Sequence, residues 1–493
     1  MKFIVKPRNR YIEVIAQGKE GVAIFPTYVP GSYVIRELER NVVEIEGFRI
    51  TKNRFYVKEN FKYLVYASSR DQREAISTND YLFINPPAVF PFQNIYEKYC
   101  VKIETNWKVA TTLQEENGYY CADNYHEFAD SPIEASPELK VLQVDEGHYV
   151  STIDDVDLTM LGRIVSEADK VIEPKDKYIF HFRRSDRNFG GIEHKKSTGI
   201  VVPWDKKDLS ILFAHEYFHR LNVKKLVPKD LNHNYEKEVY TDLLWFAEGF
   251  TDYMAHLICL RAGLNTPEEI FRRVLQSLHN LTFPGAKRVS LSEASKTAWI
   301  KYYKQDENFL NASISYYDGG LALGFYVDLR LAERGNRIDE LFKTLPERYT
   351  FRDVEKTLEG LGFHELELAN KPAYHILEAI GRVIDLQFVD KGKKYYGLLL
   401  DNQRVKFVEE NSPADLAGLM PEDQIVGVDG IYKPLEVKDY VKLHVIREGR
   451  LKQIELIAGE NPGHSLRGKI EEEYARKIFS RDMVEAVYNS VII

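Results

Sequence analysis

The sequence is poor in cysteine and has no long apolar run. Its three cysteines, Cys100, Cys121 and Cys259, are widely spaced and odd in number, so we expect neither a disulfide framework nor a zinc-knuckle site, and a reducing compartment is favoured. No stretch approaches the roughly 18 uninterrupted apolar residues that a membrane-spanning helix requires. Basic residues interrupt the segment from Met1 to Arg8, which excludes the apolar region of a signal peptide. We therefore expect a soluble, cytoplasmic protein without a membrane partner.

An excess of positive charge is also missing. The chain has 67 Lys and Arg residues against 75 Asp and Glu residues, which gives a formal net charge of −8. Proteins that neutralise many phosphates need a strongly basic surface. We therefore expect no nucleic-acid partner.

The apolar content, in contrast, is sufficient for several cores. The 493 residues are 44% hydrophobic and 29% charged, close to the average of soluble globular proteins. The length exceeds one compact core and predicts about two to four domains. A single small binding module and wholesale disorder are both excluded.

Local patterns divide the chain into several predicted parts, and the fold class is multidomain α+β. Short β-branched and aromatic runs predict an all-β, sandwich-like domain over 1–150. Mixed patterns over 151–265 predict an α/β catalytic subdomain, and 266–384 is expected to be helical. Short strands return over 385–460, and the tail 461–493 has the pattern of an amphipathic helix.

The sharpest chemical signal is His215-Glu216-Tyr217-Phe218-His219, inside a predicted helix over 208–222. Residues four apart share a helix face, so both imidazoles can reach one metal ion while Glu216 points toward its open position. This is the spacing of a zinc hydrolase. Two surface histidines on an ordinary helix remain the alternative until a third ligand is found.

A third ligand is available at Glu248, which lies among apolar residues of a second predicted helix over 241–261. A buried carboxylate is costly unless it is paired or bound to a metal. Two imidazoles, one carboxylate and a water would complete a tetrahedral catalytic zinc site. Asp252, one turn later, is expected to accept the second ring N–H of a ligating histidine. An ordinary surface aspartate is the alternative for Asp252.

The expected reaction is hydrolysis of an amide. Zinc would lower the pKa of its bound water and polarise the carbonyl, while Glu216 takes the proton and passes it to the leaving amine. A neutral hydroxyl facing the developing oxyanion would add stabilisation. Tyr316 and Tyr317, at the head of a third predicted helix, both offer one, and with 31 tyrosines in the chain position alone does not choose.

These helical motifs, with the linker Asn222–Pro228 and Pro30-Gly31-Ser32-Tyr33 followed by Arg36-Glu37, resemble the glycyl aminopeptidase family of PDZ-containing gluzincins. The family is related to the aminopeptidase N group. The resemblance implies a thermolysin-like catalytic domain, one zinc ion per chain, and peptide substrates with a free N-terminus, with glycine or alanine preferred. For the segment around Gly31, a packed turn with an ion pair is the alternative to a direct catalytic role.

The resemblance also implies roles for single residues. Gly190-Gly191-Ile192-Glu193 resembles the edge-strand element of the aminopeptidase N group, so Glu193 is expected to hold the substrate amine. Gly190 and Gly191 would let the substrate backbone approach. An ion pair of Glu193 with Lys195 or Lys196 is the alternative.

The same comparison selects Tyr317 over Tyr316 as the hydroxyl donor. Tyr317-Asp318-Gly319-Gly320 stands where related enzymes have Tyr-x-Lys-Gly, with Gly319 in place of the lysine. His194 replaces the asparagine that follows the glutamate of the aminopeptidase N element. A contact with the substrate is one reading of His194, and a structural role is the more common one for a lone histidine.

Residues 411–430 resemble part of a PDZ domain. Such domains add a peptide as a strand and bind its C-terminal carboxylate on backbone N–H groups. Tyr396, Gly397 and Leu398 occupy the position of the carboxylate loop. A peptide C-terminus is therefore a candidate partner. The alternative is an architectural role, packing on the catalytic domain or on a second copy in a homo-oligomer.

The leading prediction is a zinc aminopeptidase. One alternative is a zinc endopeptidase that recruits protein C-termini through the PDZ-like domain. The other is a catalytically silent PDZ adaptor, which would have no use for Glu216.

Overall fold

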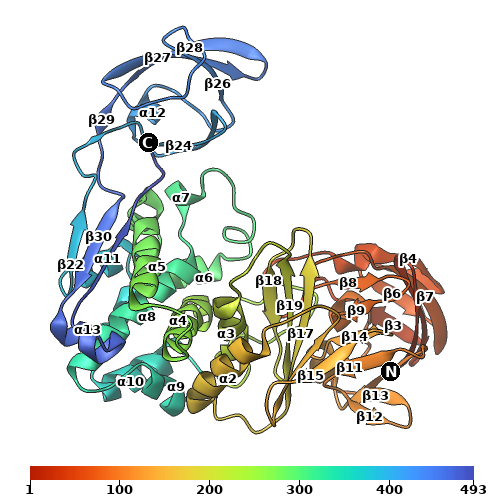
Figure 1. The fold of residues 1–493 in the computed structure, drawn as a ribbon. Helices are drawn as coiled ribbons and strands as arrows, with labels where there is room; N and C mark the ends of the chain where they lie inside the picture. Colours follow the sequence, from red (N-terminus) through yellow and green to blue (C-terminus); the bar gives the residue numbers. More distant parts are fainter. The chain divides into compact units, whose positions relative to one another are not determined.

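The computed structural model describes residues 1–493, and the chain forms two compact units, Met1–Val239 and Tyr240–Ile493. Each unit has its own sheets and helices (Figure 1). No helix combines the length and the apolar character needed to cross a membrane.

The first unit begins with sheets whose strands pair antiparallel except for the parallel pair β1–β10, and its alternating apolar residues predict strands. In one strand Ile12, Val14 and Ala16 are fully buried, so one face of the strand packs on the core. The largest sheet has the order β12-β13-β10-β1-β2-β7-β4. Its strands are β1 (Lys2–Arg8), β2 (Tyr11–Gln17), β4 (Val42–Ile45), β7 (Asn60–Tyr66), β10 (Tyr99–Ile103), β12 (Gln114–Glu116) and β13 (Tyr119–Ala122).

Two smaller sheets and three short helices complete this β-rich part, so its predicted character is confirmed. The four-stranded sheet contains β8 (Ala75–Ser77), β9 (Leu82–Ile84), β11 (Lys108–Thr111) and β14 (Ile133–Ser136), and the three-stranded sheet contains β3 (Gly21–Ile24), β5 (Gly47–Arg49) and β6 (Arg54–Val57). The helices are η1 (Leu38–Asn41), η2 (Pro86–Ala88) and α1 (Tyr125–Ala129).

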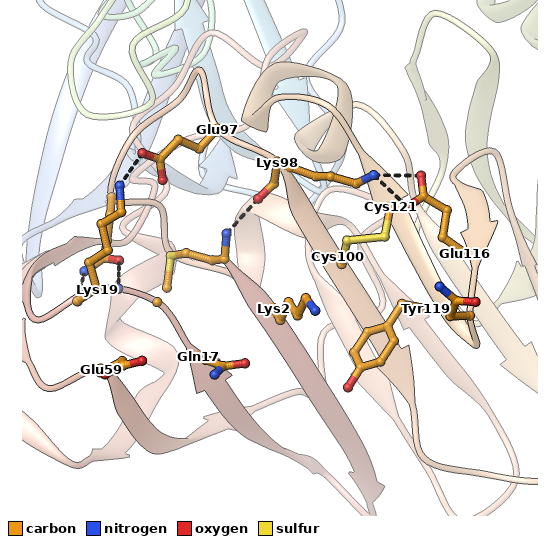
Figure 2. A pocket seen from close by; sticks show the side chains of 14 residues that line it. Lys2, Gln17, Lys19, Glu59, Glu97, Lys98, Cys100, Glu116, Tyr119 and Cys121 are labelled. Carbon is orange, nitrogen blue, oxygen red and sulfur yellow. Dashed lines mark hydrogen bonds and ion pairs between the residues drawn. A yellow bond between two sulfur atoms is a disulfide. The ribbon is translucent and has the colours of Figure 1, made fainter.

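The expected absence of a disulfide is wrong, because Cys100 and Cys121 are bonded. They stand directly opposite each other in the antiparallel pair β10–β13, a proximity that their spacing of 21 residues does not reveal. Figure 2 shows the bond in the lining of a pocket of about 560 Å³ that contains none of the predicted catalytic residues. The cysteines therefore no longer favour a reducing compartment. Cys259 is buried and takes no part in a disulfide.

A five-stranded sheet and two helices carry the predicted chemistry of the first unit. The sheet has the order β15-β16-β17-β19-β18, with β18 antiparallel at one edge. Figure 1 shows the helices α2 and α3 beside it. The elements are β15 (Lys140–Gln143), β16 (His148–Thr152), β17 (Tyr178–Ser185), β18 (Gly190–Glu193), β19 (Ser197–Pro203), α2 (Leu158–Ile172) and α3 (Ser210–Phe218), followed by β20 (Val227–Pro228).

This catalytic sheet begins before the predicted boundary at residue 150. The strands β15 and β16 belong to it because β16 pairs in parallel with β17. Strand patterns alone do not reveal which sheet a strand joins. The other predicted domain boundaries remain predictions.

The second unit is helical at first, as predicted for 266–384. A π-helical turn, η3 (Trp245–Phe250), continues into α4 (Thr251–Arg261), and η3 packs against α8 (Tyr316–Glu333). The helix α8 is buried on nearly all sides, which marks it as the centre of this core. The remaining elements are α5 (Pro267–Asn280), η4 (Pro284–Lys287), α6 (Leu291–Lys296), α7 (Phe309–Ala312), α9 (Asp339–Thr344), β21 (Arg348–Tyr349), α10 (Phe351–Leu361), η5 (Leu366–Asn370) and α11 (Tyr374–Ile380).

Short strands follow from residue 385, as expected. A five-stranded antiparallel sheet is formed in chain order by β24 (Leu398–Asp401), β25 (Arg404–Val408), β26 (Gln424–Val428), β27 (Tyr440–Arg447) and β28 (Arg450–Ile457), with α12 (Pro413–Leu416) between β25 and β26. A two-stranded sheet pairs β23 (Lys394–Tyr395) with β29 (Gly459–Glu460).

The prediction of a helical tail over 461–493 is wrong in large part. Only α13 (Glu472–Phe479) is helical. The strands β30 (Leu466–Ile470) and β31 (Val484–Tyr488) form a sheet with β22 (Asp385–Phe388), and β31 packs against α5. Alternate side chains, Val484 and Ala486, are buried. This spacing of two residues is that of a strand rather than a helix.

Candidate functional site

The two histidines of the predicted metal motif face each other at the end of α3. His215 lies in the last turn, and His219 follows it with a backbone that is still helical. Their Nε2 atoms are 3.0 Å apart. Two nitrogens bound to one tetrahedral zinc at about 2.05 Å would lie roughly 3.3 Å apart. The pair is therefore spaced close to what a shared metal ion requires.

The ring of His219 is oriented by the backbone. Its Nδ1 lies 2.7 Å from the carbonyl oxygen of Asn222. A carbonyl only accepts, so Nδ1 carries the proton and Nε2 keeps its lone pair, which is the state that a metal ligand needs. The partner of His219 is thus a backbone carbonyl and not Asp252, and for His215 the predicted role of Asp252 stays a prediction. The chain turns just after α3 and brings its own carbonyl back to the ring, and a backbone acceptor leaves no signal in the sequence.

In the second unit, Asp252 belongs to an ion-pair network between helices. Arg273 of α5 donates to Asp252 of α4 and to Asp318 of α8, each at 2.9 Å. Burial acts to lower the pKa of Arg273, but the two carboxylates raise it overall. The network ties together the three helices around Glu248 and Tyr317. Arg273 and Asp318 were not identified from the sequence, because their contact joins segments far apart in the chain.

Glu248 and Tyr317 approach each other where η3 crosses the head of α8. Glu248 is 2% exposed. A Cβ on Gly249 would lie 2.4 Å from the Cα of Gly320, and a Cβ on Gly320 would lie 2.2 Å from the carbonyl oxygen of Trp245. Only glycine permits this close contact of two backbones.

Tyr317 keeps its proton in this surrounding. Burial, and then the negative charge of Glu248, raise the pKa of Tyr317 well above its usual range. Its hydroxyl is therefore a donor at neutral pH. Tyr316, the other candidate, is fully buried, whereas Tyr317 is partly exposed. The structure thus gives an independent reason to favour Tyr317.

In the first unit, the carboxylate of Glu216 lies over the edge strand β18. A Cβ built on Gly191 would lie 2.1 Å from the Cδ of Glu216. A side chain at position 191 would therefore displace the Glu216 carboxylate, in addition to any obstruction of a substrate backbone. Gly190 has φ +141°, a conformation that other residues rarely adopt.

Glu193 lies at the end of β18 and is 4% exposed. Gly31, with φ +91°, lies against it, and a Cβ at this position would be 2.5 Å from Oε1 of Glu193. The alternative of an ion pair with Lys195 or Lys196 is not what the structure has: Lys196 pairs with Asp176, at 4.0 Å, and no ion pair joins Glu193 to either lysine.

The turn around Gly31 contains an ion pair, as expected, but Arg36 does not pair with the adjacent Glu37. Arg36 lies 3.4 Å from Asp71, and its side chain also donates to the hydroxyl of Ser32. Glu37 instead contacts Lys52, at 3.1 Å. The segment is a packed turn, and it also lines the Glu193 carboxylate.

A buried lysine, Lys224, provides positive charge near the carboxylates of Glu193 and Glu216. Lys224 lies 3.0 Å from Asp130, which also contacts Nδ1 of His194 at 3.1 Å. Burial acts to lower the pKa of Lys224, but Asp130, Glu193 and then Glu216 raise it. The contact of His194 with Asp130 is in accord with a structural role, which stays a prediction. Lys224 was noted only as part of the linker.

The predicted metal ligands are therefore His215 and His219 in the first unit and Glu248 in the second, each of which offers one ligand atom. The predicted carboxylate loop, Tyr396 to Leu398, lies at the start of β24 in the second unit.

Two family models match this sequence. A model described as M61 glycyl aminopeptidase matches residues 208–323, and a model of the peptidase M61 N-terminal domain matches residues 10–137. The chain matches the M61 peptidase family. The first M61 match runs from just before α3 into α8 and contains every predicted metal ligand. These findings support a peptidase. The matches end before residue 385, so the PDZ-like nature of the C-terminal part remains a prediction.

A solved structure shares the fold. The crystal structure of an aminopeptidase N family protein from Idiomarina loihiensis superposes with a TM-score of 0.83, at 20% identity, over 99% of this chain and 98% of that chain. Yeast LTA4 hydrolase in complex with bestatin gives a TM-score of 0.43 at 13% identity, over 75% of this chain and 67% of that one. An M1 zinc metallopeptidase from Deinococcus radiodurans gives a TM-score of 0.41 at 11% identity, over 76% of this chain and 92% of that chain. The last two similarities are too weak to carry an argument. Among curated proteins, none matches the sequence.

Proposed function

We propose that this chain is a zinc-dependent aminopeptidase that removes N-terminal residues from peptides. The observation that carries the proposal is the pair of imidazoles with Nε2 atoms 3.0 Å apart, one of them oriented by the Asn222 carbonyl. The M61 match supports a peptidase. A preference for N-terminal glycine or alanine, and a cytoplasmic location, are parts of the proposal that rest on the sequence alone.

In this proposal His215, His219 and Glu248 hold the zinc ion. When bound, zinc polarises the substrate carbonyl and lowers the pKa of a bound water. An imidazole pair and a carboxylate are the donor set of known catalytic zinc sites, and they leave one position for water or substrate. The near-complete burial of Glu248 is in accord with a carboxylate that serves a cation.

The protein's own groups carry the proton and orient the substrate. Glu216 takes a proton from the attacking water and returns it to the leaving amine. Tyr317 donates a hydrogen bond to the developing oxyanion, for which its raised pKa suits it. Asp252 acts indirectly, because its bond to Arg273 helps to fix the helix that carries Glu248.

Glu193 holds the α-ammonium group of the substrate. It is a nearly buried carboxylate at the end of an edge strand, and it has no ion pair with the neighbouring lysines. A charged amine would be a direct partner in addition to the positive charge that Lys224 already provides nearby. An endopeptidase, in contrast, needs open space at this point for the preceding residues of its substrate.

The test compares aminoacyl-nitroanilides that have a free amine with their acetylated forms. We expect cleavage of the free-amine compounds only, and a large fall in kcat/KM for Glu193→Ala with unchanged zinc content. Lys195→Ala, at an exposed neighbouring position, is the matched control and should behave like the wild type. Equal cleavage of acetylated substrates would favour the endopeptidase alternative.

A further inference from the structure

A pocket of about 360 Å³ in the second unit has no role in the chemistry described so far. It lies where the loop between α6 and α7, the head of α8 and the strand β25 meet. None of the proposed metal ligands lines it. Its volume falls within the range of about 300–1,000 Å³ that is usual for ligand pockets.

The walls of this pocket are fixed to one another by hydrogen bonds. The side chain of Asn311 in α7 donates to the carbonyl of Val408 in β25 at 2.9 Å and accepts from the N–H of Glu410 at 3.0 Å. Arg288 forms an ion pair with Glu410 as well. Because α7 and β25 are tied together in this way, the pocket is a built feature of the second unit.

One wall of the pocket contacts the proposed oxyanion donor. The ring of Tyr302 lines the pocket, and its centroid lies 5.3 Å from that of Tyr317. Ser315 and Asp318, which stand on either side of Tyr317 in the sequence, line the pocket too. Burial above all raises the pKa of Tyr302, and the negative charge of Glu248 contributes. The pocket therefore begins one side chain away from the proposed reaction centre.

The inner surface of the pocket is largely apolar. Phe309, Ile314 and Phe407 line it and are buried, and Leu310 is half-buried beside them. Surfaces of this kind gain free energy when another apolar side chain covers them. The inner part of the pocket thus suits a large apolar side chain.

The rim of the pocket is acidic. Asp306 and Glu307 line it, are exposed, and take part in no ion pair. The only basic residue in the lining, Lys406, already pairs with Glu422 at 3.3 Å. A ligand with a basic group at the rim is therefore favoured over one with an acidic group.

We propose that this pocket binds the part of a peptide substrate that leaves after cleavage. It takes a large apolar side chain from one of the first three residues after the cleaved bond, and it favours a basic residue next to that side chain. This inference rests on the proposed aminopeptidase function. An extended peptide advances about 3.4 Å per residue, so three residues cover about 10 Å, which exceeds the 5.3 Å between the rings of Tyr302 and Tyr317. The substrate class is thus oligopeptides rather than single aminoacyl amides.

The first test measures the release of alanine from peptides with a free amine. The reference is Ala-Gly-Gly-Gly-amide, and in three further peptides leucine replaces one glycine each. We expect one leucine peptide to exceed the reference in kcat/KM by about 10-fold to 100-fold, as burial of a leucine side chain would provide. Leu310→Ala should lower this ratio by roughly 3-fold or more, because it removes part of the apolar surface. Leu451→Ala, at an exposed position outside the pocket, is the matched control and should keep the ratio.

The second test concerns the charge of the rim and uses a position where folding is not at risk. The preferred leucine peptide is compared with lysine or with glutamate next to the leucine. The wild type should favour lysine by about 2-fold to 5-fold, as exposed ion pairs do, and Glu307→Lys should reverse this preference. Glu347→Lys changes the net charge equally at an exposed position outside the pocket and should keep it.

The outcomes separate this inference from the proposed function. If alanine nitroanilide is not cleaved by the wild type, the aminopeptidase proposal fails. If it is cleaved but no leucine peptide exceeds the reference, the pocket does not bind the leaving peptide. An unchanged ratio in folded Leu310→Ala, or an unchanged charge preference in Glu307→Lys, would equally refute the assignment.

Discussion

Replacement of Gly31 by alanine tests whether the N-terminal turn shapes the substrate site. The new Cβ would lie 2.5 Å from Oε1 of Glu193, 2.7 Å from Oε2 and 2.8 Å from Cδ. An ordinary contact is roughly 3.4 Å, so the carboxylate must move by about 0.9 Å. A misplacement of about 1 Å at a reacting site can cost roughly 100-fold in rate.

We therefore expect kcat/KM for aminoacyl-nitroanilides to fall between about 10-fold and 100-fold in Gly31→Ala. Zinc content should not change, because Glu193 is not a proposed ligand. The backbone also contributes strain, since φ at Gly31 is +91° and a left-handed conformation costs an alanine roughly 1–2 kcal/mol.

Gly118→Ala separates the two effects. Gly118 has φ +78°, and a Cβ there meets nothing within 4 Å. The control therefore carries similar backbone strain without the clash and should retain full activity. Wild-type activity in Gly31→Ala, or an equal loss in Gly118→Ala, would refute the reasoning.

Three further predictions concern the chemistry and its support. Glu216→Gln should keep its zinc and lose at least about 100-fold in kcat; equal activity by nitroanilide assay would remove Glu216 as the base. Tyr317→Phe should lower kcat by about 10-fold to 1000-fold with little change in KM, and its loss should persist across neutral pH, because the pKa of Tyr317 is raised and its hydroxyl stays protonated. Burial acts to raise the pKa of Asp130, but Lys224 and His194 lower it overall, so its contribution to stability is present above its unfolded pKa of about 3.9 and is lost as the pH falls further. Thermal unfolding of Asp130→Asn should accordingly occur at a lower temperature than that of the wild type at pH 7, and the difference should begin to shrink only as the pH falls below about 3.9; a difference that stays constant under stronger acid would contradict this.

The chemical motifs were predictable because they depend on local spacing. A helix places residues four apart on one face, so His215 and His219 could be paired without any tertiary information. The same holds for the run of strand-forming residues that starts β17. The choice of Tyr317 also needed the resemblance to related enzymes, because its position in the sequence did not exclude Tyr316.

What the sequence could not reveal depends on pairing between distant segments. The Cys100–Cys121 bond requires the order of strands in a sheet, and the network of Arg273 requires the packing of three helices. The role of Asn222 is carried by a backbone carbonyl, which is the same for every residue type. The strand β31 was mistaken for helix because its neighbour α13 is strongly amphipathic.

The most direct test of the account is the zinc content of the purified chain by mass spectrometry after dialysis. We expect one zinc ion per chain for the wild type and for Glu216→Gln, and strongly reduced zinc for His215→Ala and for Glu248→Gln, with folding checked by circular dichroism. Full zinc content in folded Glu248→Gln, or a wild-type chain that binds no zinc, would contradict the proposed metal site.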